Sequence, residues 1–130
     1  MMRDARPLVD ALREPASVEA LSGSQWTDLI SIARAESLIG SLAHRLEQTT
    51  MPDRVRAVLQ DAIGAHDLAR QQALWEADCA QRALADYPGK IVLMKGTAYV
   101  AANMSAGVGR SIGDLDIMVA REDLTVVETA

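Results

Sequence analysis

The sequence predicts an α+β fold in which a helical region, residues 1–89, precedes a short strand-helix-strand region, residues 90–130. Two observations support this prediction. Apolar residues recur every three or four positions through most of the first region, which is typical of amphipathic helices. After a Pro-Gly turn at residues 88–89 the pattern changes to short apolar runs at 91–94 and 117–120, which are typical of strands.

Prolines divide the beginning of the helical region. Pro7 favours a short helix to about residue 13, because its missing N–H costs nothing in a first helical turn, and Pro15 ends that helix. Residues 17–21 then form a further helical turn, which Gly23 closes. The sequence therefore begins with two short helical pieces.

Two longer helices follow. The first runs from an N-cap at Thr27 to about residue 48 and has a broad apolar face. Pro52 prevents its continuation, and Asp53 caps the second helix, which ends near residues 87–89. These two helices make up most of the helical region.

The strand-helix-strand region begins with residues 91–94, whose unbroken apolar centre predicts a strand buried on both faces. The elements expected after it are a helix opened by Gly96-Thr97 and continuing from Ala98 to about Asn103, a glycine-rich loop over 104–113, a strand over 114–120 and a helix from Glu122.

Composition excludes several classes of protein. The formal net charge is −5, from 13 basic and 18 acidic residues, which argues against a protein that coats the nucleic-acid backbone. The apolar runs are far shorter than the roughly 20 residues of a membrane span, and no apolar segment follows the basic N-terminus, Met1 to Arg6. We therefore expect a cytoplasmic protein with no membrane partner.

We assign no functional site to four residues of the helical region whose side chains are aromatic or could bind a metal. Trp75 and Cys79 are expected to pack in a core or an interface. His44 and His66 are isolated, because neither has a histidine four residues away or a cysteine nearby. The local spacing thus favours structural roles for all four.

Asp114 and Asp116 are the most informative pair. Side chains at positions i and i+2 of a strand project from the same face, so these two carboxylates lie close together, while Leu115 and Ile117 point the other way. Two like charges at this spacing are unfavourable unless a cation lies between them. Mg²⁺ favours carboxylate oxygens together with substrate phosphates, so the pair predicts a magnesium site. Solvated aspartates at an exposed strand edge or turn are the alternative interpretation.

Phosphate-binding features precede this pair in the chain. Gly96-Thr97 opens a helix, and the free N–H groups of a helix N-terminus bind phosphate. Arg110 offers a fixed positive charge suited to a triphosphate or to a neighbouring carboxylate. An ordinary helix start and a solvated loop arginine are the alternative interpretations.

Together, Val92 to Thr97, Tyr99, Arg110 and Gly113 to Val119 resemble the nucleotidyltransferase superfamily, which has the DNA polymerase β-like fold. The resemblance is closest to an uncharacterised bacterial nucleotidyltransferase-like family with the signature LKG…Y…R…DIDLLV. It implies that residues 1–89 are a helical lead-in and that residues 90–130 begin a mixed-sheet nucleotidyltransferase core.

The resemblance also implies an activity and a set of site residues. The activity is the metal-dependent transfer of a nucleoside monophosphate from a nucleoside triphosphate to an acceptor that the sequence does not identify. By motif position, Asp114 and Asp116 are the catalytic, metal-binding aspartates, with Mg²⁺ or Mn²⁺ as the cofactor. The nucleotide-binding residues implied in the same way are Lys95, Gly96, Thr97 and Arg110.

The sequence also departs from the superfamily pattern. A third carboxylate normally comes from a later strand, whereas the acidic residues after Asp116, which are Glu122, Asp123 and Glu128, fall on the helix that follows directly. We therefore expect a truncated core, and whether this chain is an active enzyme stays open. The alternative is a non-catalytic nucleotidyltransferase-like or helical protein-interaction module, and a homodimer or a protein partner bound through the helices fits both interpretations.

Overall fold

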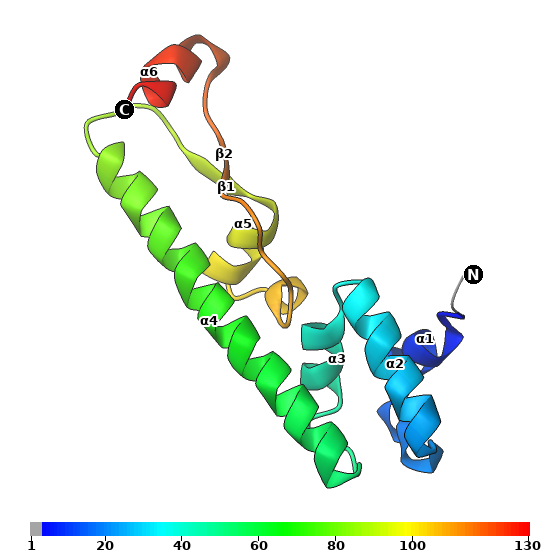
Figure 1. The fold of residues 1–130 in the computed structure, drawn as a ribbon. Helices are drawn as coiled ribbons and strands as arrows, with labels where there is room; N and C mark the ends of the chain where they lie inside the picture. The colour runs from blue at the N-terminus through cyan, green and yellow to red at the C-terminus, as the bar shows by residue number, and fades with distance from the viewer. Residues whose placement is uncertain (1–3) are drawn as a thin grey trace. The chain divides into compact units, whose positions relative to one another are not determined.

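The computed structural model describes residues 4–130 and has an α+β fold, in which helices are combined with a small antiparallel sheet (Figure 1). The fold class predicted from the sequence is therefore confirmed. Part of the expectation about the N-terminus falls on residues 1–3, which lie outside the described residues. Among the described residues, no helix is both long enough and apolar enough to cross a membrane.

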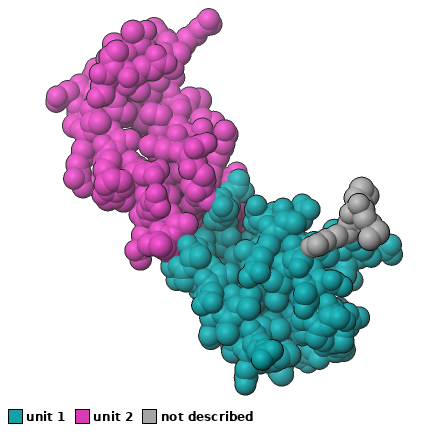
Figure 2. Space-filling view, viewed as in Figure 1, with its two compact units in different colours: residues 1–67, 108–111 teal, residues 68–107, 112–130 magenta. Residues whose placement is uncertain are grey.

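The chain divides into two compact units (Figure 2). The first comprises the residues up to 67 together with 108–111, and the second comprises 68–107 and 112–130. The division falls inside the long helix α4 (Asp53–Ala83), whereas the sequence pattern changes at residues 89–90. The compact units and the two regions of sequence pattern thus have different boundaries.

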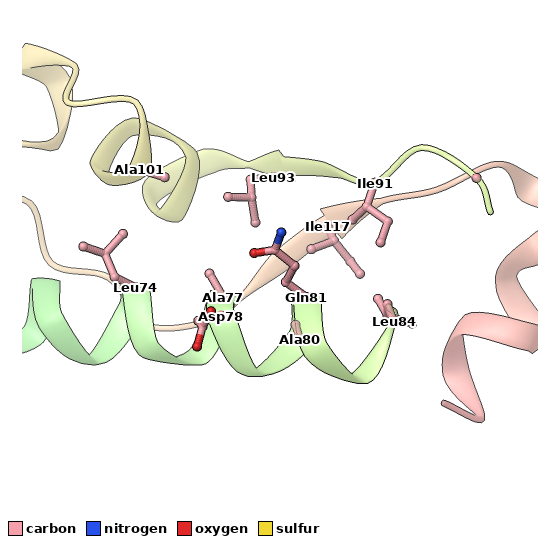
Figure 3. Close-up of a pocket in the computed structure, with 11 residues that line it drawn as sticks. Leu74, Ala77, Asp78, Ala80, Gln81, Leu84, Ile91, Leu93, Ala101 and Ile117 are labelled. Atoms are coloured by element: carbon pink, nitrogen blue, oxygen red, sulfur yellow. The ribbon is translucent and has the colours of Figure 1, made fainter. Parts of the chain in front are cut away.

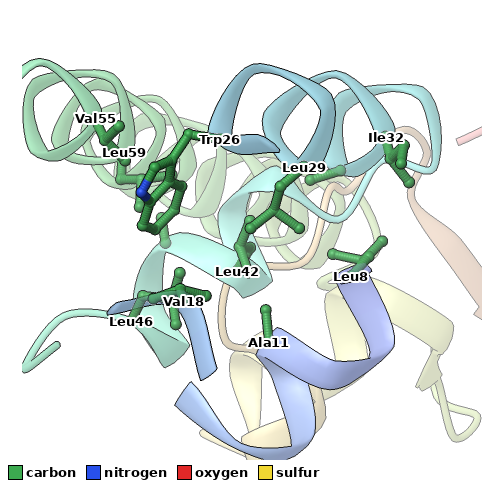
Figure 4. Close-up of a cluster of buried hydrophobic side chains, with 12 residues drawn as sticks. Leu8, Ala11, Val18, Trp26, Leu29, Ile32, Leu42, Leu46, Val55 and Leu59 are labelled. Atoms are coloured by element: carbon green, nitrogen blue, oxygen red, sulfur yellow. The ribbon is translucent and has the colours of Figure 1, made fainter. Parts of the chain in front are cut away.

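The first unit is built from helices. Its core includes Leu29, Leu42 and Leu46, which are completely buried, and the indole of Trp26 (Figure 4). In Figure 4, Leu29 of one helix lies beside Leu42 of the next. The elements of this unit are α1 (Arg6–Arg13), a 3₁₀ helix η1 (Pro15–Ala20), α2 (Gly23–Ala35), α3 (Ile39–Arg45) and the first part of α4.

The single helix expected over residues 27–48 is wrong, because a turn separates α2 from α3. Ser37 adopts a left-handed conformation with φ of 57°, and the N–H of Leu38 donates to the carbonyl of Ala33 at 2.7 Å. With the bond from the Ser37 N–H to the Arg34 carbonyl, this is a Schellman ending, with serine where glycine is usual. The local hydrogen bonds therefore end α2 in a segment whose apolar pattern continues.

The expected N-cap at Thr27 is also wrong. Ser22 caps α2, because its hydroxyl accepts from the N–H of Gln25 while the Gln25 side chain accepts from the Ser22 N–H. This reciprocal capping box satisfies two backbone donors, so it defines the helix start more strongly than a lone threonine does. Gly23 accordingly begins α2 and does not close the preceding turn.

The second unit contains the sheet. Strands β1 (Val92–Met94) and β2 (Asp116–Met118) pair antiparallel, with Leu93 opposite Ile117. The remaining elements are the second part of α4, α5 (Lys95–Ala101), the 3₁₀ helices η2 (Ser105–Gly107) and η3 (Arg121–Asp123), and α6 (Leu124–Glu128).

The expectation that the first strand is buried on both faces is wrong. Val92 and Met94 are 46% and 38% exposed, whereas Leu93 between them is half-buried. Figure 3 shows Leu93 and Ile117 on the side of the sheet that faces α4. When one helix covers a two-stranded sheet, only one face of the sheet is shielded from water. Alternate residues of β1 therefore remain in solvent.

A cavity of about 450 Å³ lies between α4 and the sheet of the second unit (Figure 3). Its lining is mostly aliphatic and includes Leu74 and Leu84 of α4 together with Leu93 and Ile117 of the two strands. Trp75, expected to be a packing aromatic, is 63% exposed. The aromatic ring thus contributes little to the packing under the sheet.

Two glycines of the first unit provide a test of its packing. A Cβ on Gly40 would lie 2.4 Å from the Gly109 carbonyl oxygen, whereas a Cβ on Gly64 would meet nothing within 4 Å. Gly40→Ala should therefore destabilise the protein by about 1–3 kcal/mol through overpacking. Gly64→Ala, inside α4, should stabilise it by roughly 0.5–1 kcal/mol, because alanine loses less backbone entropy than glycine. Urea unfolding followed by circular dichroism measures both, and equal stability of the two variants would contradict the close approach.

Candidate functional site

The strand pairing brings two sequence motifs together in the second unit. Met94, the last residue of β1, is opposite Asp116, the first residue of β2. Lys95 follows Met94 directly, and its Nζ lies 3.3 Å from Oδ2 of Asp116. The lysine of the Lys95-Gly96-Thr97 segment thus forms an ion pair with the second aspartate of the predicted metal site.

Lys95 has an unusual backbone conformation at this junction. It is the first residue of α5 and has a φ of 55°, in the left-handed region that non-glycine residues rarely adopt. The sharp change of direction from β1 into α5 occurs at this residue. A strained residue between a strand and a helix is a feature that clusters at functional sites, and here it carries a charged side chain.

The ion pair is open to solvent. The side chains of Lys95 and Asp116 are 68% and 40% exposed. An ion pair of this kind typically contributes less than about 1 kcal/mol to stability, because water screens the charges and the long lysine side chain loses conformational freedom. A ligand can therefore compete for either partner at low cost.

Asp114 lies just outside the sheet. The strand expected over 114–120 is shorter than predicted, since β2 covers Asp116–Met118, and Asp114 is exposed in the segment that leads into it. Leu115 and Ile117 are half-buried, as expected for residues that point away from the two carboxylates. The structure places Asp114 two residues before the β2 residue that pairs with Lys95.

Gly96 and Thr97 lie inside α5 and not before it, because that helix begins at Lys95 and not near Ala98. Both residues are buried, and Thr97 is 1% exposed. Arg110 is exposed and belongs to the segment 108–111 of the first unit. Among the predicted nucleotide-binding residues, the structure therefore brings Lys95 into contact with a predicted metal ligand.

One of the acidic residues considered as a third carboxylate has a clear partner. Oδ2 of Asp123 accepts a hydrogen bond of 2.6 Å from the hydroxyl of Tyr87, which follows α4. This hydrogen bond, together with burial and the negative charges of Asp123 and Glu122, raises the pKa of Tyr87 to about 12. Asp123 thus connects η3 to the end of α4.

The structure also groups side chains to which the sequence pattern assigned no role. The rings of His44 on α3 and His66 on α4 are perpendicular, with centroids 5.1 Å apart. Asp67 follows His66 directly, and the three side chains offer ligand atoms within 4.8 Å of one another. Local spacing carries no signal for this cluster, because its members come from two helices that meet through the fold.

The order of elements agrees with the sequence resemblance. A helical region precedes a strand-helix-strand segment, Asp116 begins the second strand, and Asp114 lies two residues before it. A family model described as an uncharacterised nucleotidyltransferase matches residues 22–130. The chain belongs to this nucleotidyltransferase family. No curated protein and no solved structure matches it.

The Tyr87 hydrogen bond predicts a pH dependence. Because the pKa of Tyr87 in the folded state, about 12, exceeds the ordinary value of about 10, its contribution to stability is complete below pH 10. That contribution should be lost as the pH rises through about 12. In a Tyr99→Phe background, which leaves Tyr87 as the single tyrosine, tyrosinate absorbance should report this titration. Adding Asp123→Asn should bring it towards pH 10, and an unchanged midpoint would contradict the assigned cause.

Proposed function

We propose that this chain binds a nucleoside triphosphate with Mg²⁺ or Mn²⁺ and acts as the nucleotide-binding part of a cytoplasmic nucleotidyltransferase. In the reaction, an acceptor oxygen attacks the α-phosphorus, the bond to the bridging oxygen breaks, and pyrophosphate leaves. The family membership over residues 22–130 supports a nucleoside triphosphate as the substrate. The acceptor is a hydroxyl or a phosphate group.

The observation that carries the proposal is the register of the sheet. Met94 opposite Asp116 brings the end of the first motif beside the start of the second. A positive and a negative side chain thereby lie 3.3 Å apart at an exposed position. Binding of a metal-nucleotide complex needs both charges, because the metal binds to carboxylates and the phosphates bind to cations.

The donor set fits a hard divalent cation. Asp114 and Asp116 offer carboxylate oxygens that are accessible to solvent, and Mg²⁺ prefers oxygen ligands and retains several waters. We assign these two aspartates as the residues that hold the ion. When bound, the ion neutralises charge that develops on the phosphates.

Lys95 and Arg110 are proposed as the phosphate contacts, and Gly96 and Thr97 as the residues that define the backbone beneath the triphosphate. Lys95 supports this assignment best, because its ammonium group is exposed and pairs weakly with Asp116. When a metal ion binds to Asp116, the lysine is released for a phosphate oxygen. The buried Thr97 has a positioning role in this arrangement, since its side chain packs inside the second unit.

A non-catalytic interaction module is the second candidate function. Leu68 and Trp75 are seven residues, or about two turns, apart on α4 and are 67% and 63% exposed, so two large apolar side chains project from the same side of this helix. Tryptophan is enriched in surfaces that contact other proteins. This candidate requires no nucleotide.

Thermal unfolding with added ligands tests the proposal. The wild type should be stabilised by Mg²⁺ or Mn²⁺ together with a nucleoside triphosphate. At 100 times the dissociation constant the gain is about 2.7 kcal/mol, which corresponds to roughly 8 °C in Tm for a chain of this size. Asp116→Asn should lose the shift, because the amide removes the negative charge that binds the metal.

Two further variants provide a control and a test of the phosphate contact. Asp86→Asn changes an exposed aspartate outside the motifs and should keep the full shift. Lys95→Gln should keep the effect of Mn²⁺ alone and weaken the effect of the nucleotide, which separates the metal ligand from the phosphate contact. A wild type that is not stabilised by any combination would contradict nucleotide binding and favour the interaction module.

A further inference from the structure

The histidine pair of the first unit points to a second ion site. We propose that His44, His66 and Asp67 bind a transition-metal ion of the Zn²⁺ class. The two imidazoles and the carboxylate present ligand atoms that all lie within 4.8 Å of one another. All three residues belong to the first unit, so this site does not depend on the nucleotide site.

The polar atom that needs a partner is Nε2 of His44. Among the described residues, it is the buried side-chain nitrogen that has no hydrogen-bond partner. Buried polar atoms are normally bonded, and an unsatisfied one indicates a bound water or ion, or a functional constraint. A metal ion bound at Nε2 of His44 would satisfy this atom directly.

The types of ligand atom in the cluster indicate which metal ion it would bind. Imidazole nitrogen suits Zn²⁺, Co²⁺, Ni²⁺ and Cu²⁺, whereas Mg²⁺ requires oxygen ligands. Two histidines and one aspartate supply three of the four ligands of a tetrahedral zinc ion and leave one position for water. This ligand set therefore differs in kind from the carboxylate pair at Asp114 and Asp116.

Metal binding competes with a hydrogen bond that His66 already makes. Its Nε2 accepts from the backbone N–H of Gly109 at 3.1 Å. A neutral imidazole has one nitrogen lone pair available, so it cannot accept from Gly109 and bind a metal at the same time. The ion therefore replaces the Gly109 contact, and the segment 108–111 loses one of its attachments to α4.

Co²⁺ is the probe for this site, because its d–d absorption reports nitrogen ligands and low coordination number. The full-length chain is titrated with Co²⁺ in excess Mg²⁺, which fills the oxygen sites. One equivalent should bind with visible absorption, and Zn²⁺ should displace it. The absence of one-to-one binding, or of visible absorption, would overturn the proposal.

Matched variants identify the ligands. Asp67→Asn changes an exposed carboxylate, so the fold is retained, and it should weaken Co²⁺ binding by about tenfold or more. His44→Gln should do the same, whereas Asp61→Asn, an exposed aspartate on the same helix, should leave binding unchanged. Equal binding by the wild type and Asp67→Asn would overturn the ligand assignment even if His44→Gln failed to fold.

Two measurements keep this proposal separate from the nucleotide site. Asp116→Asn should bind Co²⁺ as the wild type does, so loss of nucleotide binding leaves the result intact. Zn²⁺ should also increase the hydrogen-exchange rate of the Gly109 amide, measured by nuclear magnetic resonance. An unchanged rate in the presence of bound Zn²⁺ would contradict the competition for His66.

Discussion

The antiparallel pairing of β1 with β2 is the interaction on which the candidate site depends. It places Met94 opposite Asp116, so that Lys95 and the acidic motif meet although a helix and a loop separate them in the chain. Each strand has three residues, and a two-stranded sheet of this size has little stability of its own in water. Leu93 and Ile117 lie on the side of the sheet that faces α4, where they line the cavity of about 450 Å³ together with aliphatic residues of that helix. The long helix thus covers the inner face of the sheet, although it contributes none of the charges of the site.

The ammonium group of Lys95 partly offsets the negative charge of the two carboxylates at this site. From the sequence, two neighbouring carboxylates require a cation, and a divalent ion is the cation that the resemblance implies. In the structure, the ammonium group of Lys95 lies beside Asp116 and supplies part of that charge. Because the pair is exposed, exchanging the ammonium for a metal ion costs little in stability. In the proposed function, the same lysine would then bind the phosphates of the metal-nucleotide complex, so one residue would serve both states.

Elements that depend on residues close together in the sequence could be predicted, whereas features that depend on contacts between distant residues could not. The helix that begins at Asp53 was predictable, because its apolar period continues without interruption, although it ends at Ala83 and not near residues 87–89. The turn at Ser37 was not, since serine has no strong preference for a left-handed conformation and the Schellman bonds that select it depend on the helix ending there. The exposure of Val92 was unpredictable for another reason. The same run of apolar residues occurs in strands that are covered on both faces and in strands that have one face in solvent.

The site residues divide in the same way. Asp114 and Asp116 could be proposed from the sequence because they lie two positions apart at one strand, and Lys95 because it belongs to a contiguous motif. His44 and His66 meet only through the contact of α3 with α4, so no local spacing encodes their distance. The two proposed ion sites also differ in donor type. Oxygen ligands favour Mg²⁺ and imidazoles favour Zn²⁺, so the two proposed sites are expected to prefer different ions.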